Sequence, residues 1–121
     1  MKVLLGVSGG ERAGAAIDRA VERAREAGDT LTVAVLAAAA GAESESLVDR
    51  ATAAIAEAGV DGSVRRVEGD PGSRLVQIAE EEGYDRLALA DGEQSPMGKI
   101  EVGTTAEYVL LNSHVTVTLL R

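Results

Sequence analysis

The feature that most constrains this chain is a regular alternation of short apolar segments with longer amphipathic ones. Short apolar or β-branched segments predict five strands, at residues 2–7, 30–36, 64–67, 85–90 and 115–120. Intervening segments with apolar residues at helical spacing predict four helices, at residues 12–27, 47–58, 71–82 and 104–111. This order predicts an α/β fold, because right-handed crossovers between parallel strands put helices on both faces of one sheet.

Several helix ends are marked by residues with a strong positional preference. A glycine follows each of the first three predicted helices, as the left-handed backbone of a helix terminus favours: Gly28, Gly59 and Gly83. Asp70 followed by Pro71 predicts the N-cap and the first residue of the third helix. Ser46, with Asp49 three residues later, has the spacing of a capping box and places the start of the second helix near residue 47.

Length and composition fit a single domain over residues 1–121. Apolar residues make up 45% of the chain, which is enough to build a core and argues against disorder. There is no cysteine, which excludes disulfides and thiolate metal sites. The first apolar segment is too short for a signal peptide, and no apolar run approaches the roughly 20 residues of a membrane helix. We therefore expect a cytoplasmic protein with no membrane partner.

The charge balance argues against nucleic acid as a partner. Acidic residues outnumber basic ones by 20 to 12, giving a formal net charge of −8. Nucleic-acid binding depends on Lys and Arg displacing counterions from the phosphate backbone, which an acidic surface repels. The chain also has no Phe or Trp, and only two Tyr that could stack on bases. The acidic excess instead predicts a well-solvated surface.

Two glycine-bearing segments indicate where a ligand would bind. An open parallel sheet binds ligands beyond the carboxyl ends of its strands, where the winding direction reverses. That point is flanked by Ser8-Gly9-Gly10 after the first strand and by residues 91–103 after the fourth. The second segment and the helix after it supply candidate ligands for an anion: Gly92, Gly98, Lys99, Gly103, Thr104 and Thr105.

Thr104 has a structural role open to it as well. With Glu107 three residues later, it fits a capping box at the start of the last helix. A segment as long as 91–103 is uncommon without a function, however. That observation favours phosphate binding at the amino terminus of this helix.

The order of these motifs resembles the universal stress protein family over the whole chain. Ser95-Pro96-Met97-Gly98-Lys99, followed by Gly103-Thr104-Thr105 and an apolar last strand, is similar to the carboxyl-terminal signature of its acidic archaeal members. Residues 6–10, Gly-Val-Ser-Gly-Gly, and residues 69–72, Gly-Asp-Pro-Gly, occupy matching positions earlier in the chain. The resemblance implies a flavodoxin-like (Rossmann-like), doubly wound sheet of five parallel strands in the order 3-2-1-4-5, between two helix layers.

One branch of that family binds ATP through the pattern Gly-x2-Gly-x9-Gly-Ser/Thr. By position, the resemblance implies that Gly103, Thr104 and Thr105 hold the phosphates of ATP with Mg²⁺, and that the backbone of Val35 faces the adenine. It also implies a stress-response binding or signalling module, which we expect not to be an enzyme. A homodimer formed through the last strand, residues 115–120, is implied as well, since that strand would otherwise be a free edge.

Departures from the ATP-binding pattern keep a second interpretation open. Ala90 and Glu93 occupy the two earlier glycine positions, Gly92 is one place out of register, and Ser8 stands where the family usually has Asp. A carboxylate at Glu93 would repel phosphates at short range. The alternative is the same fold without a nucleotide, acting as a dimeric stress-response interaction protein.

Two further alternatives each rest on a single feature. Ser8-Gly9-Gly10 is similar to the pyrophosphate loop of ATP-cleaving enzymes, although the Asp and second Ser of that loop are absent. A flavin carrier would need aromatic rings at the crevice, whereas Tyr84 precedes the fourth strand and Tyr108 has a spacing that predicts a core position. His114 is the only histidine, so we expect no metal site.

Overall fold

The main sheet of the protein has five parallel strands in the order β3-β2-β1-β4-β7. The computed structural model describes residues 1–8, 13–36, 41–89, 92–94, 100–102 and 104–120. The strands are β1 (Lys2–Val7), β2 (Thr30–Leu36), β3 (Gly62–Val67), β4 (Arg86–Leu89) and β7 (Thr116–Leu119). This order confirms the predicted flavodoxin-like fold, with β7 as the fifth strand of the sheet.

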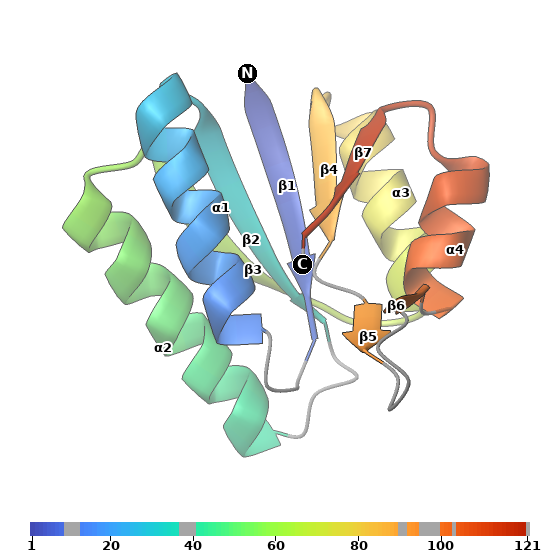
Figure 1. The fold of residues 1–121 in the computed structure, drawn as a ribbon, viewed down its shortest axis with the longest axis horizontal. Coiled ribbons are helices and arrows are strands. Elements are labelled where there is room, and N and C mark those ends of the chain that lie inside the picture. The colour runs from blue at the N-terminus through green and yellow to red at the C-terminus, as the bar shows by residue number, and fades with distance from the viewer. Residues whose placement is uncertain (9–12, 37–40, 90–91, 95–99, 103, 121) are drawn as a thin grey trace.

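Four helices form the outer layers: α1 (Ala13–Ala27), α2 (Gly41–Ala58), α3 (Pro71–Glu81) and α4 (Thr104–Asn112). Figure 1 shows α1 and α2 on one side of the sheet and α3 and α4 on the other. Each pair covers its own apolar cluster, because successive side chains of a strand point to opposite faces: Leu5 packs on the α1–α2 side and Leu4 on the α3–α4 side. Among the described residues, no helix is long and apolar enough to cross a bilayer.

The central strand β1 is in close contact with α3. A Cβ built at Gly6 would lie 2.8 Å from Cδ1 of Leu75, so a larger residue would have to displace the side chain of Leu75. Gly6 pairs with Ala34 of β2 on one side and with Leu89 of β4 on the other. The winding direction of the sheet therefore reverses beside β1.

Helix α3 has the N-cap that its sequence predicts. The carboxylate of Asp70 accepts a hydrogen bond from the backbone N–H of Ser73 at 3.0 Å, and Pro71 is the first helical residue. The helix ends at Glu81, and Gly83 beyond it has a φ of 71°, in the left-handed region. The backbone preferences of these residues set both ends of the helix.

Three predictions about local structure are wrong. Helix α2 begins at Gly41, so Ser46 lies inside the helix and does not cap it. The segment 91–103, in which no strand was predicted, contains an antiparallel hairpin of β5 (Gly92–Gln94) and β6 (Ile100–Val102). Tyr108, predicted to lie in the core, is 41% exposed, whereas Ala106 and Val109 of the same helix are fully buried.

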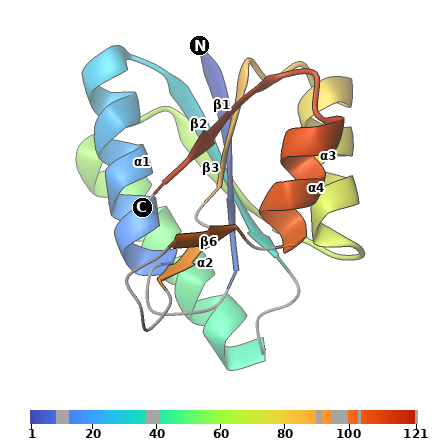
Figure 2. The same cartoon turned by 45° about the vertical axis from the view of Figure 1, so that its right-hand side comes forward.

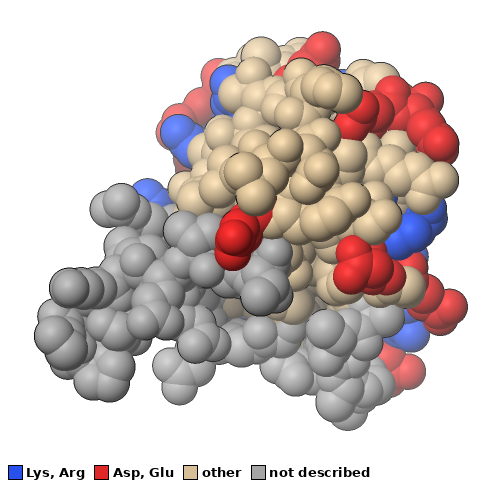
Figure 3. Space-filling model, turned by 90° about the vertical axis from the view of Figure 1, so that its right-hand side faces the viewer, with Lys and Arg blue, Asp and Glu red and all other residues tan. Residues whose placement is uncertain are grey.

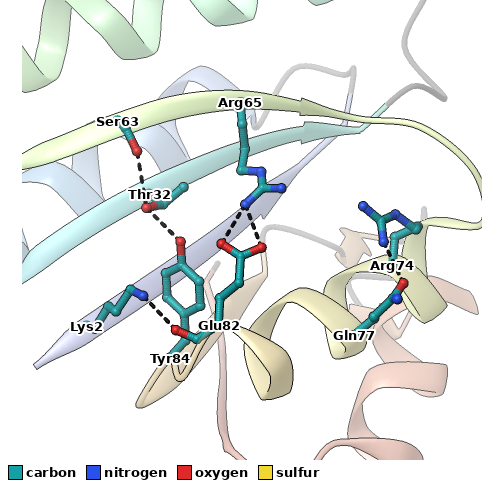
Figure 4. A network of polar contacts seen from close by, with 8 residues as sticks. All are labelled: Lys2, Thr32, Ser63, Arg65, Arg74, Gln77, Glu82 and Tyr84. Carbon is teal, nitrogen blue, oxygen red and sulfur yellow. Dashed lines mark hydrogen bonds and ion pairs between the residues drawn. The ribbon is translucent and has the colours of Figure 1, made fainter.

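A polar network closes the amino-terminal edge of the sheet (Figure 4). Nζ of Lys2 donates a hydrogen bond to the carbonyl oxygen of Glu82 at 2.7 Å and lies 4.3 Å from the centre of the Tyr84 ring. Both carboxylate oxygens of Glu82 accept hydrogen bonds from Nη1 of Arg65 at 2.9 Å. These contacts attach the carboxyl end of α3 to β1 and β3.

Candidate functional site

The carboxyl ends of β1 and β4 lie next to each other, as the predicted ligand crevice requires. Gly6 of β1 pairs with Leu89 of β4, so the chain leaves both strands at the same edge of the sheet. Ser8, directly after β1, is half-buried at this edge. The neighbouring predicted site residues Gly9 and Gly10 lie outside the described residues.

The β5–β6 hairpin brings the two ends of the second predicted segment together. Gly92 pairs with Val102, and Thr104, the first residue of α4, follows shortly afterwards. Figures 1 and 2 both place the hairpin at the end of the sheet where β1 and β4 finish. Gly92 and the start of α4 therefore lie at the same edge as Ser8. The sequence spacing gave no signal for this pairing, because each strand of the hairpin is only three residues long.

All four helices begin at this edge of the sheet (Figure 1). The amino end of a helix carries free N–H groups and a partial positive charge of roughly half an elementary charge, which favours a bound anion. Helix α4 places Thr104 and Thr105 in its first turn, and Thr105 is half-buried. Residue 103, just before this helix, lies outside the described residues. The predicted capping box of Thr104 with Glu107 therefore stays a prediction. The geometry suits an anionic ligand held by main-chain N–H groups.

Four other residues were predicted to contact the bound molecule, and the structure describes one of them, Val35. Gly98, Lys99 and Gly103 lie outside the described residues. Val35 is the penultimate residue of β2, and it pairs with β1 on one side and β3 on the other. Its side chain is 1% exposed and packs in the α1–α2 core. Any contact between Val35 and a ligand would therefore be through its backbone.

Acidic and histidine residues of the described chain do not gather into a metal centre. The hairpin register places Glu93 opposite Glu101, so two acidic residues are cross-strand neighbours at the candidate site. His114 lies in the turn before β7, at the other end of the sheet. Its side chain is 87% exposed, and its Nδ1 is 2.9 Å from Oε1 of Glu80.

The fold is that of a doubly wound α/β domain, in which the carboxyl ends of β1 and β4 and the amino end of α4 meet at one edge of the sheet beside the central strand. Comparison with protein families then identifies the kind of domain, because residues 1–121 match the model of the universal stress protein family. The chain belongs to this family, as its motifs indicated. No curated protein gives a significant match to the chain.

Solved universal stress proteins share this fold over nearly their whole length. One from Archaeoglobus fulgidus is 22% identical, covers 100% of this chain and 98% of its own, and superposes with a TM-score of 0.81. A universal stress protein in complex with cAMP is 24% identical, with coverage of 100% and 96% and a TM-score of 0.77. The universal stress protein from A. fulgidus in complex with dAMP is 19% identical, with coverage of 100% and 98% and a TM-score of 0.74.

Proposed function

We propose that this protein is a binding and signalling module that holds an adenine nucleotide in the crevice between β1 and β4. The observation that carries the proposal is the meeting of two distant segments at one edge of the sheet, Ser8 after β1 and the Gly92–Thr104 segment after β4. Two structures of the same fold contain cAMP and dAMP, which are both adenine nucleotides. The proposal extends that ligand class to this chain.

In this proposal the phosphates lie at the amino terminus of α4. Main-chain N–H groups of the first turn and the hydroxyls of Thr104 and Thr105 are the donors, and Lys99 adds a cation. Gly98 and Gly103 let the backbone approach the phosphates closely. With ATP as the ligand, Mg²⁺ would be held mainly by phosphate oxygens and water and would offset part of the phosphate charge.

We expect binding without turnover. Hydrolysis of a nucleotide needs a general base within hydrogen-bond reach of the attacking water, and histidine is the residue that most often supplies it. The only histidine of the chain, His114, lies at the opposite end of the sheet from the crevice. Nucleotide occupancy would act instead by changing which surface the protein presents to a partner.

Calorimetric titration of the full chain with ATP and with AMP, each with Mg²⁺, tests the proposal. We expect binding to the unaltered protein, and binding weaker by about tenfold or more in Thr104→Ala/Thr105→Ala, because hydrogen bonds to a charged ligand are lost. Thr52→Ala is the matched control, since Thr52 is exposed on α2 and its hydroxyl bonds the carbonyl of Val48. The absence of binding by either nucleotide at millimolar concentration would contradict the proposal.

An apolar surface on α4 favours a second candidate function, that of an interaction protein with no nucleotide. Tyr108, Leu110 and Leu111 are exposed on this helix, Leu111 by 76%. Figure 3, which views the α4 side, shows residues other than Lys, Arg, Asp and Glu over most of the described surface, with acidic residues along its upper and right margins and others in its lower part. Exposed apolar patches of this kind mark interaction sites. Native mass spectrometry of freshly purified protein would distinguish a nucleotide-bound species from a ligand-free dimer.

A further inference from the structure

A cavity of about 40 Å³ lies between helix α1 and the sheet, on the α1–α2 side of the molecule. Most of its wall is apolar: Val3, Ala20, Ala24, Leu31, Ala88 and Leu120. It is bordered by the first residues of β1 and β4, whereas the nucleotide crevice lies at their carboxyl ends. The cavity is therefore separate from the proposed nucleotide site.

Arg86, the first residue of β4, is one of the few charged residues that line this mostly apolar space. Alternation along β4 explains its position, because Leu87 and Leu89 pack on the α3–α4 side while Ala88 packs on the α1–α2 side. Nε of Arg86 is buried, and no described residue accepts a hydrogen bond from it. A guanidinium keeps its charge at physiological pH, and buried donors in folded proteins are nearly always paired. The unpaired Nε indicates that an acceptor belongs in the cavity.

The charges around the cavity favour an acceptor that is an anion. Arg23 of α1 is a second cation on the lining. Asp29 also lines the cavity, but its Oδ1 is 3.4 Å from the amino nitrogen of Met1, so a cation already opposes its charge. Thr118 of β7 adds a hydroxyl that can donate to the same anion.

The size and shape of the space restrict that anion. A single water needs about 10–15 Å³, so the cavity can hold a carboxylate but is far smaller than the several hundred Å³ that a nucleotide-sized ligand needs. It adjoins an open groove between α1 and the end of β7, and Arg23 and Leu120 line both spaces. Figure 2 shows the end of β7 reaching toward α1. Leu119 and Leu120 give the groove an apolar wall on which an aliphatic tail can lie, and its other lining residues, Arg19, Glu22 and Arg23 of α1, are charged.

We propose that this cavity binds the carboxylate of an aliphatic monocarboxylic acid, with Arg86 as its hydrogen-bond partner and the tail in the α1–β7 groove. A planar guanidinium matches a carboxylate in bidentate geometry, and apolar surroundings strengthen such a pair. A polyphosphate would meet apolar walls on most sides, and an uncharged apolar molecule would leave Nε of Arg86 unpaired. The mixed lining thus fits a ligand with one anionic end and one apolar end.

Titration of the ¹⁵N-labelled full chain with sodium octanoate, followed by NMR of the backbone amides, tests this site. We expect shift changes in residues 20–24, 86–88 and 118–120, and none in 92–94 or 100–105. Arg86→Gln should weaken binding by about tenfold or more, because a charge-assisted hydrogen bond is lost. Arg66→Gln removes the same charge from an exposed position on β3 and should leave the affinity unchanged. Octanol and octyltrimethylammonium serve as uncharged and cationic probes with the same tail.

A second variant keeps the test decisive if Arg86→Gln fails to fold. Thr118→Leu retains Arg86 and fills the cavity with apolar atoms, so it should abolish octanoate binding while the circular dichroism spectrum stays that of the parent. The proposal is overturned by any of three results: no response to octanoate, an equal response to octanol, or undiminished octanoate binding in a folded variant. Pairing of two chains through β7 would change the shifts of residues 118–120 with protein concentration, so these residues do not decide this point. Shift changes in residues 20–24 and 86–88 that depend on protein concentration and not on octanoate would identify a second copy as the occupant, and would overturn the proposal too.

Discussion

The hydroxyl of Tyr84 donates a hydrogen bond to Oγ1 of Thr32 at 3.0 Å, and both residues are buried. Tyr84 lies just before β4 and Thr32 lies in β2, so the bond joins segments on either side of β1. Oγ1 of Thr32 is also 3.4 Å from Oγ of Ser63 on β3 (Figure 4). A short chain of hydroxyl groups therefore crosses half of the sheet beneath the α3–α4 layer. Paired buried hydroxyls of this kind help to specify one arrangement of the strands.

Tyr84→Phe should destabilise the fold. It leaves Oγ1 of Thr32 with only the longer contact to Ser63, and we expect the free energy of unfolding to fall by about 1–2 kcal/mol. Urea denaturation followed by circular dichroism measures the loss. Thr32→Val should lower the free energy of unfolding by less in the Tyr84→Phe background than in the parent protein, because the hydroxyl of Tyr84 is already absent there. Tyr108→Phe removes an exposed hydroxyl and is the control; an equal loss there would contradict the role of the buried bond.

Gly72→Ala tests the contact between α3 and α4. A Cβ at Gly72 would lie 2.9 Å from Cδ1 of Tyr108 and 3.0 Å from its Cβ, so the alanine must push Tyr108 away. We expect this overpacking to lower the free energy of unfolding by about 1–3 kcal/mol. This loss exceeds the stabilisation that alanine gains over glycine from its higher helix propensity. Urea denaturation of Gly72→Ala in the Tyr108→Ala background should show a smaller loss, because the ring is gone and only the Cβ of residue 108, at 3.0 Å, remains in close contact. An equal loss in both backgrounds would place the strain elsewhere.

Asp70→Ala should weaken the start of α3. The substitution removes the carboxylate that accepts the N–H of Ser73, and loss of an N-cap costs about 1 kcal/mol. Asp70→Asn keeps an acceptor at the same position and should cost only a fraction of that. Thermal melting of the two variants compares them directly. Equal destabilisation by both would show that the charge at this helix end matters more than the hydrogen bond.

Strand positions and most helix bounds could be predicted because local residues determine them, whereas the strand order was implied by the family resemblance. The side chain of Asp70 and the backbone preferences of Pro71 and Gly83 set the ends of α3, and the strands follow from their short apolar or β-branched segments. The first turns of α2 could not be predicted, because residues 41–46 include glycine and serine, which are poor helix formers.

The candidate site could be predicted only as far as it follows from topology. The meeting of Ser8 with the Gly92–Thr104 segment results from strand order, which is a general rule of doubly wound sheets. The β5–β6 hairpin is too short to show a period in the sequence. The Tyr84–Thr32 bond joins residues 52 positions apart, and the buried Nε of Arg86 depends on how side chains fill the space beside α1. Neither feature leaves a local signal.

Thr116→Lys should prevent pairing of two chains through β7, which we expect to form the dimer contact. The edge strand β3 carries Arg65 and Arg66, whereas β7 carries no charged residue from Thr116 to Leu119. Lysine on an edge strand opposes the addition of another strand, and a two-fold axis would bring two such lysines together. Light scattering after size exclusion should give twice the chain mass of 12.4 kDa for the parent and a single chain mass for the variant. Thr52→Lys adds the same charge on α2 and should remain dimeric; a parent protein that is monomeric at micromolar concentration would refute the pairing.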